Sequence, residues 1–159
     1  MTITMLVENT TSQGSIGAQH GLSLFIETGG THILFDMGSD DLFAKNARVL
    51  GIDLASVDLA ILSHGHWDHG GGIAAFFALN DHAPLYVRRG AFGPYYSLHD
   101  DGIYHWAGLD HALAAHERII LTDGERSLGK GITLFGDVAD IHGVPRGNQT
   151  LFEKVGDEY

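Results

Sequence analysis

Short apolar runs, separated by polar and glycine-rich stretches, set the pattern of the first part of the chain. Runs rich in β-branched and aromatic residues predict strands over residues 2–8, 22–28 and 32–35. Gly29 and Gly30 lie between the second run and the third, and they favour a tight hairpin turn because glycine tolerates positive φ. The polar stretch 9–20 predicts a long loop after the first strand.

The next segment changes from hairpins to a helix and a buried strand. Apolar residues recur at helical spacing at Phe43, Ala47 and Leu50. Ser39 or Asp40 can cap this helix, and Gly51 is expected to end it. Residues 59–62 form a continuous apolar run, which is typical of a strand covered on both faces.

Helices and strands continue to alternate in the remaining sequence. The pattern predicts helices over 73–79 and 109–117, strands over 84–87, 118–121 and 132–135, and a long loop over 90–106. The stretch from Gly136 onward has no clear signal. This alternation predicts an α/β fold in which helices cover a sheet.

Size and composition limit the class of protein. A chain of 159 residues has room for about one domain. The absence of cysteine excludes disulfides, thiolate metal sites and a cysteine nucleophile. A net charge of −11 argues against binding nucleic acid or an anionic membrane. The sequence has neither a long apolar span nor the basic start of a signal peptide, so we expect a soluble, cytoplasmic protein.

The candidate chemistry is concentrated in six residues, His64-Gly65-His66-Trp67-Asp68-His69, directly after the buried strand. In an extended backbone His64 and His66 project to the same side and can share one ion. Asp68 and His69 follow around a turn and can face a second ion, and the glycines at 70–72 are expected to let the backbone bend sharply. Nitrogen and carboxylate ligands suit zinc, with manganese or iron as alternatives.

This motif and its surroundings resemble one protein family. His-x-His-x-Asp-His after a short apolar strand is similar to the metallo-β-lactamase-fold superfamily of metal-dependent hydrolases. Segments 5–9, 20–23, 33–38 and 62–70 resemble a branch that includes synthases of a dihydropterin linked to ribofuranosylaminobenzene phosphate. The resemblance covers about residues 1–96.

The resemblance implies a fold, a cofactor and a reaction. The fold is a metallo-β-lactamase-like αββα sandwich, and the metal ligands are His64, His66, Asp68 and His69, which hold two zinc ions in the complete site. Asp68 would also orient the attacking water. His66 stands where iron-dependent members that perform oxygen chemistry carry Glu, which favours zinc-dependent hydrolysis of an ester, amide, lactone or phosphoester in a small-molecule substrate.

Two other functions stay open. The branch name implies C–N bond formation between a pterin and a ribosylated aminobenzene phosphate. A non-catalytic metal-binding fragment is the other alternative, because only the first half of the superfamily domain is recognisable in residues 1–159 and no Gly-Cys-Ser-His-like stretch occurs in a chain without cysteine. We therefore expect a single domain that lacks its C-terminal part, and an open cleft covered by further residues or by a second copy of the chain.

Several residues are weaker candidates for the site. Asp36 can accept a hydrogen bond from a ligand histidine, or simply form a turn. Glu8 and His20 lie at the end of the first strand and its loop, where the resemblance implies a place near the site, although a solvated loop explains them as well. Aromatic and histidine side chains of the 90–106 loop can line a pocket or pack on one another, namely Tyr95, Tyr96, His99, Tyr104, His105 and Trp106.

A third histidine for the first ion is not evident from the sequence. The available candidates are His105, His111, His116 and His142, and each alone is more often a surface or core residue. Asp137 is similar to the bridging aspartate of the superfamily only superficially, so we do not assign it. The segment 124–130 fits part of a phosphate-binding loop, but a strand follows it and Gly131 replaces the Ser/Thr, so it predicts a hairpin turn.

Overall fold

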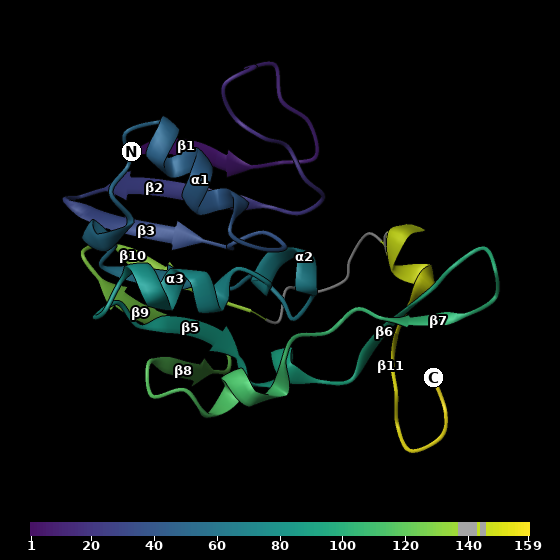
Figure 1. Ribbon diagram of the computed structural model, residues 1–159. Coiled ribbons are helices and arrows are strands. Elements are labelled where there is room, and N and C mark those ends of the chain that lie inside the picture. The colour runs from purple at the N-terminus through teal and green to yellow at the C-terminus, as the bar shows by residue number, and fades with distance from the viewer. Residues whose placement is uncertain (137–142, 144–145) are drawn as a thin grey trace.

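A six-stranded sheet forms the centre of the computed structural model, which describes residues 1–136, 143 and 146–159 (Figure 1). In spatial order the strands are β1 (Thr2–Val7), β2 (Ser23–Thr28), β3 (Thr31–Phe35), β4 (Leu59–Ile61), β5 (Leu85–Arg88) and β8 (Ile119–Thr122). The first three pair antiparallel as consecutive hairpins, whereas β3, β4, β5 and β8 are mutually parallel. The predicted strands of the first half are therefore confirmed.

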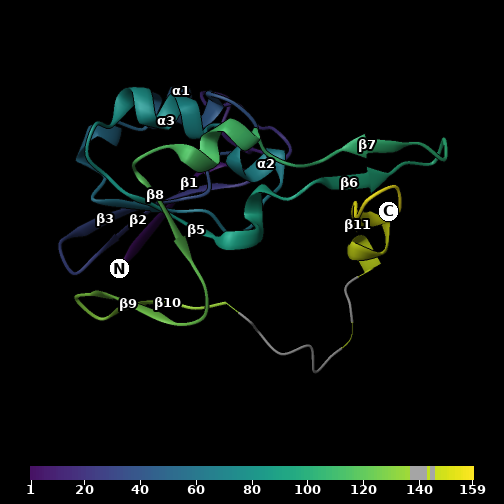
Figure 2. The same cartoon turned by 90° about the horizontal axis from the view of Figure 1, so that it is seen from below.

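The two longest helices cover one face of this sheet. Helices α1 (Leu42–Val49) and α3 (Ile73–Leu79) connect parallel strands and lie on the same side (Figure 2). Phe43 and Ala47 of α1 and Ile73 and Phe76 of α3 are buried in the main core. The helix predicted from the spacing of Phe43, Ala47 and Leu50 and the helix predicted over 73–79 are both confirmed.

The start of α1 is stabilised by the residue that precedes its N-cap. Asp41 occupies the N-cap without a side-chain capping bond, while Asp40 Oδ1 accepts a hydrogen bond from the Leu42 N–H at 2.8 Å. Ser39 instead donates its hydroxyl to the His20 carbonyl. Gly51 follows the helix with φ +73°, a conformation that glycine adopts without a Cβ penalty. The N-cap is therefore Asp41 rather than Ser39 or Asp40, although Asp40 bonds to the first turn, and the glycine stop is confirmed.

A β-hairpin packs on the opposite face of the sheet. Strands β9 (Arg126–Gly129) and β10 (Ile132–Leu134) pair antiparallel below the sheet (Figure 2). A second apolar cluster is formed by Ile33, Leu59 and Ile61 of the sheet, and Leu128, Ile132 and Leu134 of the hairpin pack against it. Residues 59–62 are buried throughout, as expected for a strand covered on both faces. The phosphate-loop-like segment is part of this hairpin, as predicted.

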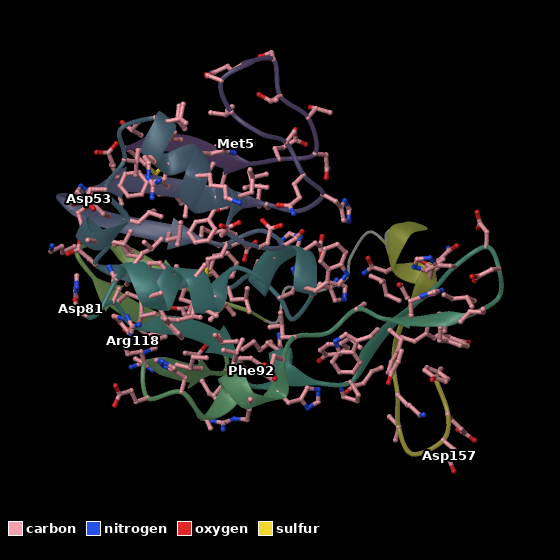
Figure 3. The ribbon with its side chains drawn as sticks, in the orientation of Figure 1. Met5, Asp53, Asp81, Phe92, Arg118 and Asp157 are labelled. Atoms are coloured by element: carbon pink, nitrogen blue, oxygen red, sulfur yellow. The ribbon has the colours of Figure 1, made fainter. Side chains whose placement is uncertain are left out.

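The segment 90–106 is not the long loop that its irregular pattern predicts. It contains strands β6 (Tyr95–Leu98) and β7 (Tyr104–Trp106), which join β11 (Leu151–Glu153) in a separate three-stranded sheet that extends away from the central one (Figure 1). All residues of β6 are only partly buried, so no alternation of apolar and polar positions marks the strand. Beyond β11 the chain turns at a loop that carries Asp157 (Figure 3).

The remaining helices are short. The helix predicted over 109–117 is only the 3₁₀ helix η3 (His111–Ala115), which the Asp110 side chain caps at its start by accepting from the Ala112 N–H and which ends where His116 becomes extended. The other short helices are α2 (Trp67–Gly70), η1 (Leu54–Ser56), η2 (Arg89–Phe92) and η4 (Arg146–Thr150). Within the described residues, no helix has the length and apolar character needed to cross a membrane. The α/β fold class is confirmed, while the incomplete domain stays a prediction.

Candidate metal centre

The predicted site lies at the carboxyl ends of two adjacent parallel strands. Asp36 follows β3 directly, and the segment 62–66 leads from β4 into helix α2, which carries Asp68 and His69. Because the carboxyl ends of parallel strands meet at one edge of a sheet, residues far apart in the sequence come together there.

His64 and His66 form one pair of ligand-type nitrogens. His64 Nε2 lies 3.0 Å from His66 Nδ1. Two zinc–nitrogen bonds of about 2.0–2.1 Å at a tetrahedral angle would place the nitrogens about 3.4 Å apart, so a small outward movement would admit an ion. The period-two argument therefore correctly predicts that these side chains meet.

Ser63 determines which nitrogen of His64 is available. The Ser63 hydroxyl donates to Asp36 Oδ2 at 2.7 Å and lies 2.9 Å from His64 Nδ1. Since the hydroxyl proton is engaged with Asp36, the serine oxygen accepts from Nδ1–H of His64. His64 Nε2 is then unprotonated and faces His66.

Asp68 and His69 form a second pair. His69 Nε2 lies 3.4 Å from Asp68 Oδ2, which is again the separation of two ligands on one ion. On its other side, His69 Nδ1 lies 2.7 Å from Asp36 Oδ2. The hydrogen bond from Asp36 to a motif histidine is therefore present, and it directs His69 Nε2 toward Asp68.

Asp36 joins both strands of this edge. Its side chain is fully buried, and its carboxylate also accepts from the Ser63 N–H at 2.7 Å. The residue has φ +56°, a left-handed conformation that Asp tolerates better than most residues. Asp36 thus forms the turn and orients a histidine, so the two interpretations left open by the sequence both apply.

Glu8 and His20 border the second pair. A cavity of about 200 Å³ is lined by Glu8, Asn9, His20, Gly21, Leu22, Asp68 and His69. His20 Nε2 lies 3.3 Å from Asp68 Oδ2, whereas the Glu8 carboxylate accepts from the N–H and hydroxyl of Thr10. Both residues therefore lie beside the motif, but His20 contacts it whereas the Glu8 carboxylate bonds within its own loop.

The charge is distributed unevenly over the motif histidines. Burial, reinforced by His69 and His66, lowers the pKa of His64 to about 4, and burial also lowers the pKa of His66. Burial acts to lower the pKa of His69 as well, but hydrogen bonds to Asp36 and Asp68 outweigh it and raise that pKa to about 9. His64 and His66 are therefore held in the neutral form that binds metal, beside a carboxylate pair that favours positive charge.

Asp68 is held as an anion. Its burial acts to raise the pKa, but the hydrogen bond and charge of His69, together with the charge of His20, lower it overall. A carboxylate and three imidazoles form a donor set that fits a divalent transition metal. In their present positions the described residues contain no group of three or more His, Asp or Glu side chains that could hold an ion, so the donors stand as pairs.

The proposed third-ligand histidines have other neighbours. His105 lies 3.5 Å from Asp101, His111 packs on Trp106, and His116 stacks on Phe77. His142 and Asp137 lie outside the described residues. None of these contacts of His105, His111 and His116 involves the motif.

The aromatic residues of 90–106 mostly pack on one another and on aromatic residues of the C-terminal segment. Tyr96 contacts Trp106, and Tyr104 stacks on Tyr159. Tyr95 differs, because it lines a cavity with His66 and with residues of β11. Most of these residues therefore pack against other aromatic side chains, whereas Tyr95 lines a pocket.

The glycine run after His69 serves close packing rather than a sharp bend. Gly71 has φ −62° and Gly72 has φ −80°, values that any residue adopts, so the predicted need for conformational freedom is wrong. A Cβ at Gly71 would lie 2.1 Å from the Ser39 carbonyl oxygen, and one at Gly72 would lie 2.3 Å from that of Met37. The glycines allow α2 and α3 to approach the loop that follows β3.

Comparison with known proteins decides the family. The profile of the metallo-beta-lactamase superfamily matches residues 16–151. The chain belongs to this superfamily. A crystal structure of a metal-dependent hydrolase of the β-lactamase superfamily superposes with a TM-score of 0.76 at 30% identity, over 98% of this chain and 55% of that one. An N-acyl homoserine lactone lactonase, at 20% identity and a TM-score of 0.51 over 72% of this chain and 49% of that one, shares the fold.

Two curated relatives come from Methanocaldococcus jannaschii. One is an uncharacterized protein, 38% identical over 45% of this chain and 27% of its own length. The other is 7,8-dihydropterin-6-methyl-4-(beta-D-ribofuranosyl)-aminobenzene-5'-phosphate synthase, 35% identical over 47% of this chain and 28% of its own length. The chain thus spans little more than a quarter of the curated relatives it matches.

Proposed function

We propose that the chain carries the metal-binding part of a metal-dependent hydrolase that acts on an ester, amide, lactone or phosphoester bond of a small molecule. The observation that carries the proposal is the arrangement of four donor side chains in two pairs at ligand-like separations, His64 with His66 and Asp68 with His69. Membership in the metallo-beta-lactamase superfamily supports a hydrolytic reaction. Zinc is the metal we expect, because the donors are nitrogen and carboxylate oxygen.

The roles of the residues follow from their contacts. His64, His66, Asp68 and His69 would hold the metal, which lowers the pKa of a coordinated water to about 7 and so supplies hydroxide at neutral pH. Asp36 and Ser63 contact Nδ1 of His69 and of His64, respectively, which leaves Nε2 of each ring for the metal. Asp68, kept anionic, would accept a hydrogen bond from the attacking water and orient it toward the substrate carbonyl or phosphorus.

A substrate panel tests the reaction type. The zinc-loaded chain would be assayed with a phosphodiester, a lactone, an aryl ester and an amide, with and without a chelator. We expect turnover of at least one substrate class that is lost on chelation and restored by zinc. A chain that holds metal stoichiometrically and hydrolyses none of them would contradict the proposal.

A synthase is the second candidate, favoured by the 35% identity to the dihydropterin synthase. The same preparation would be incubated with a ribofuranosylaminobenzene phosphate and a dihydropterin that carries a leaving group on its 6-methylene carbon. Formation of the C–N bond with release of that leaving group, without hydrolysis of the panel, would support this alternative over the hydrolase.

A further inference from the structure

The N-terminal loop 9–22 brings one more imidazole to the motif. Asn9 Oδ1 accepts a hydrogen bond from the Gly21 N–H at 3.3 Å and lies 3.1 Å from His20 Nδ1. Because the Asn9 atom that faces the ring is an acceptor, Nδ1 of His20 carries the proton. Nε2 of a neutral His20 is then the unprotonated nitrogen.

His20 and His69 are held in the same way around one oxygen. His20 Nε2 lies 3.3 Å from Asp68 Oδ2, and His69 Nε2 lies 3.4 Å from the same atom. Each ring has its Nδ1 against a side-chain oxygen, of Asn9 for His20 and of Asp36 for His69. The two Nε2 atoms and the Asp68 oxygen between them form a set of two nitrogens and one oxygen, which a divalent cation could bind in place of the protons that join the rings to the carboxylate.

The backbone that carries His20 is fixed against helix α2. Gly21 has φ +122°, and a Cβ at this position would lie 1.9 Å from the Asp68 carbonyl oxygen. The His20 carbonyl accepts a hydrogen bond from Ser39 Oγ at 2.7 Å. The imidazole itself is 71% exposed and has room to turn. The backbone of His20 is therefore held in place, while its ring can rotate toward an ion.

We propose that His20 is a third protein ligand of the ion held by Asp68 and His69. This inference rests on the proposed function for the presence of that ion. The rings are not yet placed as a three-ligand group, so binding requires His20 to rotate toward Asp68 and His69. Asn9 is then a positioning residue, which fixes the tautomer of His20.

Metal titration of the full chain tests the ligand assignment. Zn²⁺ binding would be measured by competition with a chromogenic chelator, and Co²⁺ loading would be followed by its visible absorption. The variants are His20→Ala, Asn9→Ala and, as a matched control, His82→Ala, since His82 is an exposed histidine that contacts Asp81. Circular dichroism would verify that each variant is folded.

The expected effects differ in size. Loss of an outer partner of a ligand histidine weakens metal binding about 10–100-fold, so Asn9→Ala should fall in that range. His20→Ala should lower the affinity for the ion at Asp68 and His69 by more than Asn9→Ala does. It should also change the Co²⁺ spectrum, because water replaces a nitrogen donor. His82→Ala should match the wild-type chain.

The outcomes separate this inference from the proposed function. Unchanged affinity and an unchanged Co²⁺ spectrum in folded His20→Ala would overturn the ligand role of His20 and leave the hydrolase proposal standing. A wild-type chain that binds no ion in the titration would contradict both. Equal losses in His20→Ala and His82→Ala would likewise overturn the assignment, because the effect would not be specific to the site.

Discussion

Asp36 Oδ2 lies 2.7 Å from His69 Nδ1, and the carboxylate that makes this contact is fully buried at the end of β3. The same carboxylate accepts from the Ser63 N–H and hydroxyl, so it ties the carboxyl ends of β3 and β4 together. One buried side chain therefore orients His69 directly and His64 through Ser63.

Replacement of Asp36 should affect both metal binding and stability. Asp36→Ala should weaken metal binding about 10–100-fold, because His69 loses its outer partner. It should also lower the free energy of unfolding by about 1–3 kcal/mol, because the Ser63 N–H loses its acceptor. Asp36→Asn retains an acceptor oxygen and is the matched control. Chelator competition and urea unfolding measure the two effects, and a wild-type affinity in Asp36→Ala would contradict the orienting role.

Asp68 should matter more for turnover than for substrate binding. Since a water-orienting carboxylate acts mainly in the transition state, Asp68→Asn should lower kcat far more than it changes KM. The comparison is made at saturating zinc, with the substrate that the panel identifies. Near-normal kcat in the metal-loaded variant would show that Asp68 only shapes the loop.

The glycine run can be tested through packing. Gly71→Ala should lower the free energy of unfolding by about 1–3 kcal/mol, because the new Cβ meets the Ser39 carbonyl. Gly14→Ala is the control, since a Cβ there has no neighbour within 4 Å and the residue lies in the exposed loop. Urea unfolding measures both variants. A Gly71→Ala chain as stable as Gly14→Ala would refute the close-packing explanation.

Arg118 stabilises the end of α3 from the neighbouring strand region (Figure 3). Its guanidinium donates to the carbonyls of Asn80 and Phe77 and lies 4.2 Å from the Phe77 ring centroid. Arg118→Met should cost about 1–3 kcal/mol, because these carbonyls lose their donor. Arg89→Met removes only an exposed ion pair with Asp123 and should cost less than about 1 kcal/mol. Equal thermal shifts for the two variants would contradict the distinction.

Local periodicity in the sequence predicts only part of the site. The pairing of His64 with His66 follows from side-chain alternation, and burial of residues 59–62 follows from their continuous apolar run. The approach of His20 to Asp68 depends instead on the path of a long loop, which no local pattern specifies. The only signal for it was the family resemblance around residue 20.

The errors in the fold also have physical causes. Strand β6 pairs with both β7 and β11, and none of its residues is fully buried, so the sequence of this segment shows no alternation of apolar and polar positions. The role of Gly71 and Gly72 was misjudged because close backbone packing leaves the same glycine signature as positive φ. Helical spacing of apolar residues over a short segment does not distinguish an α-helix from a 3₁₀ helix, and residues His111–Ala115 form the latter.

The metal content of the purified chain tests the central claim most directly. Elemental analysis would compare the wild-type chain with the His64→Ala/His66→Ala double variant, with His82→Ala as a histidine-loss control. We predict a bound transition metal in the wild-type chain and in His82→Ala, and loss of metal in the double variant. Unchanged metal content in the double variant would contradict the assignment of this motif as the metal centre.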